Sequence, residues 1–509
     1  MHAELRADPG QKYRLLLFLL LIGVTLFRLF YIQIIELAPD EAYYWTWSKQ
    51  LQWGYYDHPP LVAFIIWLST KLAGDTELGV RLGWVIMGTL SAFFIYKLGS
   101  EMFKDAAIGF WSACLMNIIL LMATGAVIVT PDGPQGLCWI LAVYLLGKAI
   151  NGEKKILWYA GGIVFGVGLL AKYTMVLLGP SLFFFLLSYP QGRKWLQSKE
   201  PYLAFVIGLL IFSPVILWNY QHEWISFRMQ FAHGLELKEG AGWRTFGDFW
   251  AGQAGVVSPL LFLLLIWSMI YAGGQGFKGQ INLLLLFWTS APVLAFFAYA
   301  SLRSKVEANW PALAYFSAVI ALIWLLKEKW GKWKSFPKGL VGVAVFVSLL
   351  STVVAHLQPF YRIIPLSPAH DPTSQLKGWR ILGERILEVA RANGKGDQVF
   401  LLTPQHQLVG EAMFYTQRRY PVYQWHAPLR INNLSAGNAP PNGSRAIFFS
   451  ENQENLPEDV ASLFQSCAKV EDVVIYRQSE LVRKHPIWKC TGFAKEKLKT
   501  SSGLVFPSK

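Results

Sequence analysis

The chain is dominated by long apolar segments separated by short polar ones. A helix needs about 20 apolar residues to cross the hydrocarbon core of a bilayer, and most of these segments approach that length. The pattern predicts about 11 membrane crossings, with a shorter apolar run at 61–72 forming a re-entrant or interfacial helix. The predicted spans are 13–35, 80–97, 106–129, 134–150, 157–171, 175–188, 202–218, 252–271, 281–300, 311–326 and 340–356.

The pattern changes after His356. Four prolines follow within a few residues, and the sequence then becomes charged. "LKGWRILGERILEVARANGKGDQVFLLT" (376–403) predicts an amphipathic helix, a glycine-containing turn and a strand, while "RAIFFS" (445–450) and "DVVIYR" (472–477) predict further strands. The chain therefore divides into a membrane domain, residues 1–357, and a small soluble α/β domain, residues 358–509.

Composition supports a multi-pass membrane protein. Of the 509 residues 54% are hydrophobic and only 15% are charged, whereas soluble domains carry about 25% charged residues. The formal net charge of +14 is typical of positively charged cytoplasmic loops and of attraction to anionic lipid, and nucleic acid is not an expected partner.

Loop charges fix an expected orientation. With the N-terminus in the cytoplasm, alternation of the spans places all of the basic loops on the same side, as the positive-inside rule requires. These loops are 97–104, 151–155, 191–199, 273–280 and 327–338. The soluble domain then lies outside the cytoplasm. The side chains that could take part in catalysis or binding converge on that outer face: Asp40, Glu41, Asp57, His58, Asp132, Lys172, His222, His233, Arg303 and Lys305.

The first outer loop, residues 36–60, concentrates acids and aromatics. Asp40 and Glu41 directly follow the first apolar segment, and the pair Pro59–Pro60 stiffens the backbone after Asp57. Aromatic rings alone would suit an interfacial belt, and the charges alone would suit a solvated loop. Together they also suit a sugar, whose C–H face stacks on rings while its hydroxyls bind carboxylates.

Five short motifs carry a resemblance to a known family. They are "PDEAYYW" (39–45), "GYYDHPP" (54–60), "VRL" (80–82), "TPD" (130–132) and "LLAKYT" (169–174). They resemble the bacterial membrane glycosyltransferases related to protein O-mannosyltransferases and to the aminoarabinose transferase of lipid A, glycosyltransferase families 39 and 83. The resemblance covers about residues 13–360 and implies a GT-C fold, here with about 11–13 transmembrane helices and a C-terminal extracytoplasmic α/β domain.

The resemblance also implies a reaction. A polyprenyl-phosphate-linked sugar is the donor, and the sugar passes to an envelope acceptor such as lipid A or another lipid or glycan, at the periplasmic face of the inner membrane. Asp40 matches the family's catalytic acid. Asp57 and His58 lie where relatives carry Glu-Lys before proline, so His58 departs from a phosphate-binding lysine. A divalent metal ion is the one cofactor that the resemblance allows, and Asp57 and His222 are its candidate ligands.

Glycosyl transfer chemistry assigns further candidates. Asp40 is the predicted base, with Glu41 and Asp132 as further active-site carboxylates. Asp132 has the alternative of capping the helix that begins near Gly133. Donor phosphate and sugar are expected to bind Tyr44, Tyr56, His58, Arg81, Lys172, Tyr173, Arg303 and Lys305, because cationic groups stabilise a departing phosphate. Lys172 and Arg81 have the alternative of snorkelling to the interface, and the Arg303–Lys305 pair that of a solvated turn.

Two features stay open in the sequence. Residues 218–234 predict a long outer loop or a gating helix. Cys467 and Cys490 lie in the soluble domain, where they form a disulfide in an oxidising compartment or remain unrelated thiols. Cys114 and Cys138 lie in apolar runs and predict inert packing residues.

Other classes fit the composition less well. A transporter or flippase of polyprenyl-linked sugars would place charges near the membrane midplane, whereas here the acids cluster in an outer loop. A polysaccharide polymerase or ligase would be expected to carry its main outer loop late in the chain. An assembly protein that binds partners through the soluble domain, and a protein O-mannosyltransferase acting on a protein acceptor, are the remaining alternatives.

Overall fold

The computed structural model describes residues 9–152, 154–234, 236–394, 398–425 and 438–498. These form two compact units. Unit 1 comprises Met1–Phe30, Gln52–Ile65 and Arg81–Val354, and unit 2 comprises Tyr31–Leu51, Ile66–Val80 and Ala355–Lys509. The first outer loop is therefore shared between the units, with its acidic start in unit 2 and the segment around Asp57 in unit 1.

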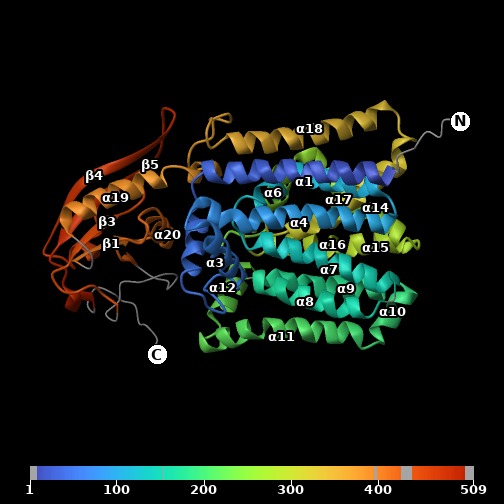
Figure 1. Ribbon diagram of the computed structural model, residues 1–509, viewed down its shortest axis with the longest axis horizontal. Helices are drawn as coiled ribbons and strands as arrows, with labels where there is room; N and C mark the ends of the chain where they lie inside the picture. The colour runs from blue at the N-terminus through green and yellow to red at the C-terminus, as the bar shows by residue number, and fades with distance from the viewer. Residues whose placement is uncertain (1–8, 153, 235, 395–397, 426–437, 499–509) are drawn as a thin grey trace. The chain divides into compact units, whose positions relative to one another are not determined.

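Long apolar helices make up unit 1 and run side by side (Figure 1). Among the residues that the structure describes, seven helical segments are long and apolar enough to cross a membrane, which confirms the prediction of a polytopic helical protein. They are α1 (Pro9–Ile34), α4 (Glu77–Phe103), α7 (Asp132–Gly152), α11 (Glu200–Gln221), α14 (Pro259–Phe277), α15 with α16 (Ile281–Trp288 and Ala291–Ser301) and α18 (Ser335–Leu357).

Shorter helices complete the bundle. Four of these short segments are also apolar: α3 (Leu61–Ala73), α5 (Ala106–Ile118), α8 (Ile156–Ala171) and the continuous pair η1 (Tyr173–Leu177) and α9 (Leu178–Leu187). The others are α6 (Leu120–Gly125), α10 (Pro190–Leu196), α12 (Ile225–Gly234) and α13 (Trp243–Val257). Helix α17 (Ala312–Trp330) is longer, with 19 residues, and covers nearly all of the predicted span 311–326. Residues 218–234, predicted as a loop or a gating helix, are thus mostly helical.

Two predicted spans are interrupted. The segment 252–271 was expected to be one helix, but α13 ends at Val257 and α14 begins at Pro259. Ser258 between them has φ +84°, a left-handed conformation that no helix accommodates, and proline lacks the N–H that would continue the ladder. The segment 106–129 is likewise divided, because Ile119 is extended between α5 and α6.

Close helix packing in unit 1 depends on small residues. Helix α8 packs against both α7 and α11. A Cβ atom on Gly162 would lie 2.3 Å from the carbonyl oxygen of Ala204, and one on Gly166 would lie 2.8 Å from that of Gly208. Small residues spaced four apart let two helix backbones approach closely within a membrane, so these glycines set the distance between α8 and α11.

A five-stranded sheet forms the core of the C-terminal part of unit 2. Its order is β2-β1-β3-β5-β4, in which β1 is parallel to β2 and β3, while β5 is antiparallel to β3 and β4. The strands are β1 (Val399–Thr403), β2 (Val422–Gln424), β3 (Arg445–Phe449), β4 (Ser466–Arg477) and β5 (Glu480–Thr491). The expected helix and strands therefore form, the helix being α19 (Trp379–Asn393).

Alternating side chains cover both faces of this sheet. Val399 and Leu401 of β1 join a core with α19 and α20 (His406–Tyr415), whereas Phe400 and Leu402 join a second core with Phe464 and its neighbours. Strict alternation of this kind buries both faces of a strand. The remaining short elements of unit 2 are α2 (Pro39–Trp47), η2 (Pro372–Leu376), α21 (Glu458–Ala461) and η4 (Lys495–Lys497).

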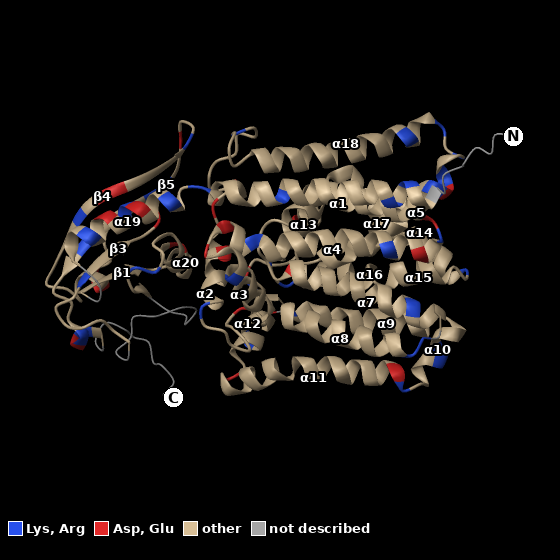
Figure 2. Ribbon diagram, in the orientation of Figure 1, with Lys and Arg blue, Asp and Glu red and all other residues tan. Residues whose placement is uncertain are grey.

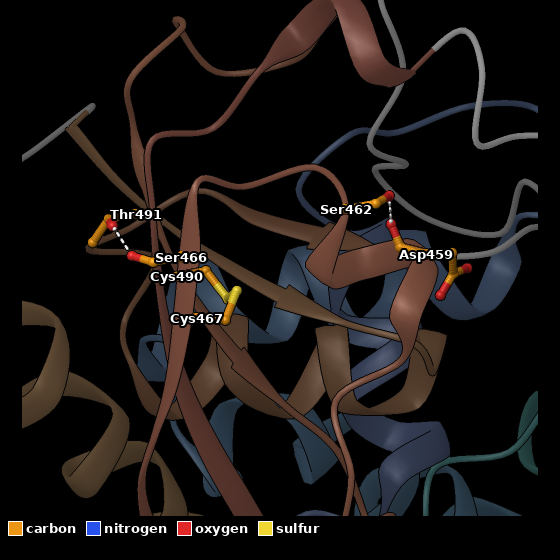
Figure 3. Close-up of a disulfide and its surroundings, with 6 residues drawn as sticks. All are labelled: Asp459, Ser462, Ser466, Cys467, Cys490 and Thr491. Atoms are coloured by element: carbon orange, nitrogen blue, oxygen red, sulfur yellow. Dashed lines mark hydrogen bonds between the residues drawn. A yellow bond between two sulfur atoms is a disulfide. The ribbon is translucent and has the colours of Figure 1, made fainter.

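Cys467 and Cys490 form a disulfide between β4 and β5, where the two residues are direct partners in the strand register (Figure 3). The hydroxyls of Ser466 and Thr491 are hydrogen-bonded beside it, 2.9 Å apart. Of the two alternatives that the sequence left open, a disulfide or two unrelated thiols, the structure has the disulfide. Cys114 and Cys138 are free thiols within helices, as expected.

Candidate active site

A buried ion pair organises the polar centre of unit 1. Lys172 follows the last residue of α8, and Asp132 is the first residue of α7. The Lys172 Nζ atom donates to Asp132 Oδ1 at 2.7 Å, and Asn309 Nδ2 donates to Asp132 Oδ2, also at 2.7 Å. The Lys172 side chain is 7% exposed. A lysine this deeply enclosed is costly without a partner, so Asp132 serves to hold the cation and the amide rather than simply to cap α7.

Aromatic and histidine side chains surround this ion pair. The Lys172 ammonium lies 5.9 Å from the ring centroid of Trp310, within cation–π range. The rings of Trp310 and His233 lie 5.3 Å apart, edge to face. The group of Asp132, Lys172, Asn309, Trp310, His233 and His58 is called the Lys172 cluster below.

His58 is uncharged in this setting. Burial, together with the nearby positive charges of Lys172 and His233, lowers the pKa of His58 to about 3. At neutral pH the imidazole of His58 is therefore uncharged, because desolvation and the neighbouring positive charge oppose its protonation. Phosphate binding by His58 stays a prediction. A neutral imidazole still offers one N–H donor. Lys172, which is paired with Asp132, supplies the ammonium group of this cluster.

The loop before His58 is attached to α11 and α12. Trp218 Nε1 donates to Gln52 Oε1 at 3.1 Å, and Gln230 Nε2 donates to the main-chain oxygen of Asp57 at 2.6 Å. His222 stacks on the Trp218 ring with centroids 4.0 Å apart, and its Nδ1 lies 2.7 Å from the Trp218 carbonyl oxygen. These contacts fix the backbone that carries Asp57 and His58.

Asp40 and Glu41 have different settings in unit 2. Asp40 lies in the first turn of α2 and is exposed, and its Oδ1 accepts a 2.9 Å hydrogen bond from Gln407 Nε2 of α20. Glu41 is fully buried, and its Oε2 accepts from the main-chain N–H of Ala38 at 2.8 Å. Glu41 thus closes the start of α2 as a capping residue does, while Asp40 presents a carboxylate at the surface of its unit.

Helix α2 is held by the C-terminal part of the chain. A Cβ atom on Gly410 of α20 would lie 2.8 Å from the backbone of Ala42 and Tyr43, so the two helices touch backbone to backbone. Before α2, the main-chain N–H of Leu37 donates to the Tyr415 hydroxyl at 2.9 Å. Both contacts lie within unit 2 and set the position of Asp40.

The other predicted residues have varied surroundings. Tyr44 is buried against Tyr43 and Trp47, which favours a packing role over sugar binding. The Tyr173 hydroxyl shares a 2.8 Å hydrogen bond with Ser226. Arg81 is fully buried in α4, and Tyr56 and Arg303 are half-buried. Lys305 is exposed and pairs with Glu307 at 2.9 Å, as in a solvated turn.

A metal site is not apparent in the part of the chain that the structure describes. No three His, Cys, Asp or Glu side chains gather there into a group that could hold an ion. The pair Asp57 and His222 stays a prediction. Because protein metal sites ordinarily use three or more such ligands, no step below is routed through a metal.

Sequence reasoning missed three polar partners. Asn309 and Trp310 lie in the segment that had attracted notice for Arg303 and Lys305, and Gln407 lies in the soluble domain. A signal for the first two existed, since residues 301–310 precede the next span at the same outer end as Asp132 in the predicted topology. Gln407 had no such signal, because its contact with Asp40 joins residues 367 positions apart.

Comparison with known proteins identifies relatives. The family model described as dolichyl-phosphate-mannose-protein mannosyltransferase matches residues 57–218. The lipid A galacturonosyltransferase RgtD of Rhizobium johnstonii is 28% identical over 345 residues, 66% of this chain and 71% of that protein. An undecaprenyl phosphate-α-4-amino-4-deoxy-L-arabinose arabinosyl transferase of Pseudomonas fluorescens is 26% identical over 61% of this chain, which spans 57% of that protein.

Solved structures agree on the fold. ArnT from Cupriavidus metallidurans in the apo state superposes with a TM-score of 0.59 at 16% identity, covering 96% of this chain and 99% of that one. The same enzyme bound to undecaprenyl phosphate gives a TM-score of 0.57. The chain is therefore a multi-pass membrane glycosyltransferase with the GT-C fold. It is similar in sequence to the dolichyl-phosphate-mannose-protein mannosyltransferase family model and to lipid A galacturonosyl and aminoarabinose transferases.

Proposed function

We propose that this glycosyltransferase moves a sugar from a polyprenyl-phosphate donor to lipid A or a related envelope glycan, on the extracytoplasmic side of the inner membrane. Two relatives are named for lipid A or undecaprenyl-phosphate sugar transfer, and the solved ArnT structure is described as bound to undecaprenyl phosphate. The observation in this chain that carries the proposal is the Lys172–Asp132 pair.

Lys172 suits the donor phosphate. One of its three N–H donors is used by Asp132, which leaves two for phosphate oxygens. Each carboxylate oxygen of Asp132 accepts one hydrogen bond, from Lys172 and from Asn309. The ammonium is therefore already oriented before the sugar donor binds. A pre-oriented cation stabilises the negative charge that grows on a departing phosphate without further reorganisation.

Asp40 suits the base. Gln407 engages only its Oδ1 atom, and the carboxylate is exposed. In the proposed step the acceptor hydroxyl oxygen bonds to the anomeric carbon of the sugar. The bond from that carbon to the phosphate oxygen breaks, and its electron pair leaves with the polyprenyl phosphate. The acceptor proton passes to the second carboxylate oxygen of Asp40.

Two features support an extracytoplasmic soluble domain. Disulfides form and persist in oxidising compartments such as the periplasm, and Cys467 is bonded to Cys490. The basic ends of the unit 1 helices, where Figure 2 shows Lys and Arg in blue around α10, are typical of a cytoplasmic face. The family model favours one other acceptor class, a protein hydroxyl.

Mass spectrometry of the envelope tests this proposal. Lipids, glycans and proteins are compared between cells that contain the enzyme and cells that lack it. We expect one lipid or glycan component to gain a single sugar mass only when the enzyme is present. A sugar gained by proteins alone would replace lipid A with a protein acceptor, and the absence of any sugar-sized difference would refute glycosyl transfer to the envelope.

Gln407 is expected to act by positioning Asp40. In Gln407→Ala the carboxylate loses its amide partner, and kcat should fall about threefold to tenfold, which corresponds to the contribution of one ordinary hydrogen bond. The KM for the donor should stay unchanged, since Gln407 is not proposed to touch it. Gln405→Ala removes a neighbouring exposed amide with no bond to Asp40 and is the matched control. A normal kcat in Gln407→Ala would contradict the positioning role.

A further inference from the structure

Unit 2 carries a set of exposed apolar side chains that take no part in the proposed chemistry. They come from the loop that follows α18 and from the strand ends at the turn between β4 and β5. Their exposed fractions lie between 38% and 60%. This surface is called the apolar rim below and consists of Tyr361, Ile363, Ile364, Leu366, Tyr476 and Leu481.

The ends of two membrane-spanning helices belong to the same unit as the apolar rim. Unit 2 includes the last residues of α1, from Tyr31, and the last residues of α18, from Ala355. The Tyr31 hydroxyl donates to the carbonyl oxygen of His356 at 2.9 Å, so the two helices end side by side. The level at which the chain leaves the bilayer is therefore defined within unit 2 itself.

The loop of the apolar rim continues the lipid-facing side of α18. Along the last turns of this helix, Leu350, Val353 and Leu357 are 48%, 45% and 40% exposed. The main-chain N–H of Tyr361 donates to the carbonyl oxygen of Leu357 at 2.9 Å, so Tyr361 lies one turn further along the same side. Ile364 follows within about 11 Å, the reach of three residues. The rim therefore begins at a surface that acyl chains cover.

The turn between β4 and β5 is held against this loop. Arg362 Nη2 of the loop lies 2.9 Å from Glu480 Oε1 at the start of β5. Arg477 Nη1, at the end of β4, donates at 3.4 Å to the carbonyl oxygen of Gln358, the residue directly after α18. The turn therefore lies at the same level as the end of the spanning helix.

The apolar side chains at this turn point away from the core of the soluble part. Tyr476 and Leu481 are partners across the two strands, so they lie on one face of the hairpin, and they are 56% and 51% exposed. Their neighbours Ile475 and Val482 are buried in the core with α19. Tyr476 and Leu481 thus form an apolar pair without a core to cover it.

We propose that the apolar rim inserts into the interfacial region of the bilayer leaflet in which α1 and α18 end. Its aliphatic side chains contact acyl chains beside α18, while the hydroxyls of Tyr361 and Tyr476 stay at the headgroup level, where tyrosine is enriched. Exposed apolar patches mark protein or membrane contacts. Lipid is the occupant that continuity with the lipid-facing side of α18 favours. The inference does not depend on the proposed sugar transfer.

Spin labels on the full-length protein in phosphatidylcholine nanodiscs test the proposal. Labels are attached in Ile364→Cys and Leu481→Cys, one in each segment of the rim. The measurement is the ratio of collision rates with oxygen, which dissolves in lipid, and with a nickel chelate, which stays in water. A polar chelate loses free energy in apolar lipid, so this ratio should be about threefold to tenfold higher than in Ala392→Cys. Ala392 is an exposed position near the far end of α19.

A second reference position and a common background complete the design. Val353→Cys places the label on the exposed side of α18 and should give a ratio at least as high as the two rim positions. All variants carry Cys114→Ala and Cys138→Ala, which removes the free thiols and leaves the disulfide between β4 and β5 intact. Thermal unfolding and sugar transfer of each labelled variant should match those of the background protein.

Two results would overturn the proposal. A ratio at Ile364 or Leu481 as low as at Ala392 would place that segment of the rim in water. Exclusion of both oxygen and the chelate from the labels would show that protein covers the rim, either a second copy of the chain or another partner. High ratios at both positions, close to that at Val353, would support insertion into the leaflet.

Discussion

Asp40→Asn is expected to lower kcat about 10²- to 10⁴-fold, the usual contribution of a positioned general base. Asparagine has nearly the same shape, and its amide oxygen still accepts the hydrogen bond that Gln407 donates to Asp40. What is lost is the ability to take the acceptor proton. The measurement is transfer by the purified enzyme in lipid with a polyprenyl-phosphate sugar, alongside the affinity for polyprenyl phosphate and the thermal unfolding temperature.

The affinity for polyprenyl phosphate and the thermal unfolding temperature should stay near those of the parent enzyme, which separates a chemical defect from a folding defect. Asp248→Asn, which neutralises an exposed acid in α13, is the matched control and should transfer sugar normally. If the Asp40→Asn enzyme transferred sugar at the parent rate, another group would have to be the base. The GT-C fold and the proposed donor site at Lys172 would be unaffected by that result.

Lys172→Met is expected to reduce kcat about 10²- to 10³-fold, as the loss of an electrostatic donor does in other enzymes. It should also destabilise the protein by about 3 kcal/mol, because removal of one partner leaves a buried charge uncompensated on Asp132. Activity and stability are thus both affected, and a single variant cannot separate them.

A second substitution separates the two effects. In Lys172→Met/Asp132→Asn the buried charge is gone, so most of the thermal stability should return, whereas the transfer rate should stay as low as in Lys172→Met. Lys305→Met breaks an exposed pair with Glu307 and should change little, since exposed pairs contribute at most about 1 kcal/mol. Recovery of transfer in the double variant would show that Lys172 acts only through folding.

Local patterns predict the secondary structure well where one period continues. The short apolar run "VFLLT" (399–403) predicts β1, and it is continuously apolar because the sheet is covered on both faces. Runs of about 20 apolar residues predict the long spans. Breaks inside apolar runs were not predictable in this way. The kink at Ser258 depends on Pro259 and on a left-handed backbone, neither of which alters the hydrophobicity of the segment.

The site was predictable in part, because local sequence patterns show where charged residues lie along the chain but do not show their tertiary partners. The inside–outside alternation of the spans predicts which charged residues lie at their outer ends, and it places Asp132 and Lys172 on the same face. Their neutral partner Asn309 carries no charge signal and was missed. The roles of Glu41 and His58 depend on burial, which a single sequence does not show: Glu41 caps α2, and His58 is neutral.

The backbone contact between Gly410 and Ala42 has a consequence for biosynthesis. A ribosome adds about 5–20 residues per second, so roughly 20–70 s separate the synthesis of α2 from that of α20. During that interval the newly made spans already lie in the bilayer while Asp40 lacks its final support. A prematurely terminated product would therefore lack both the backbone contact at Gly410 and the Gln407 hydrogen bond that position the proposed base.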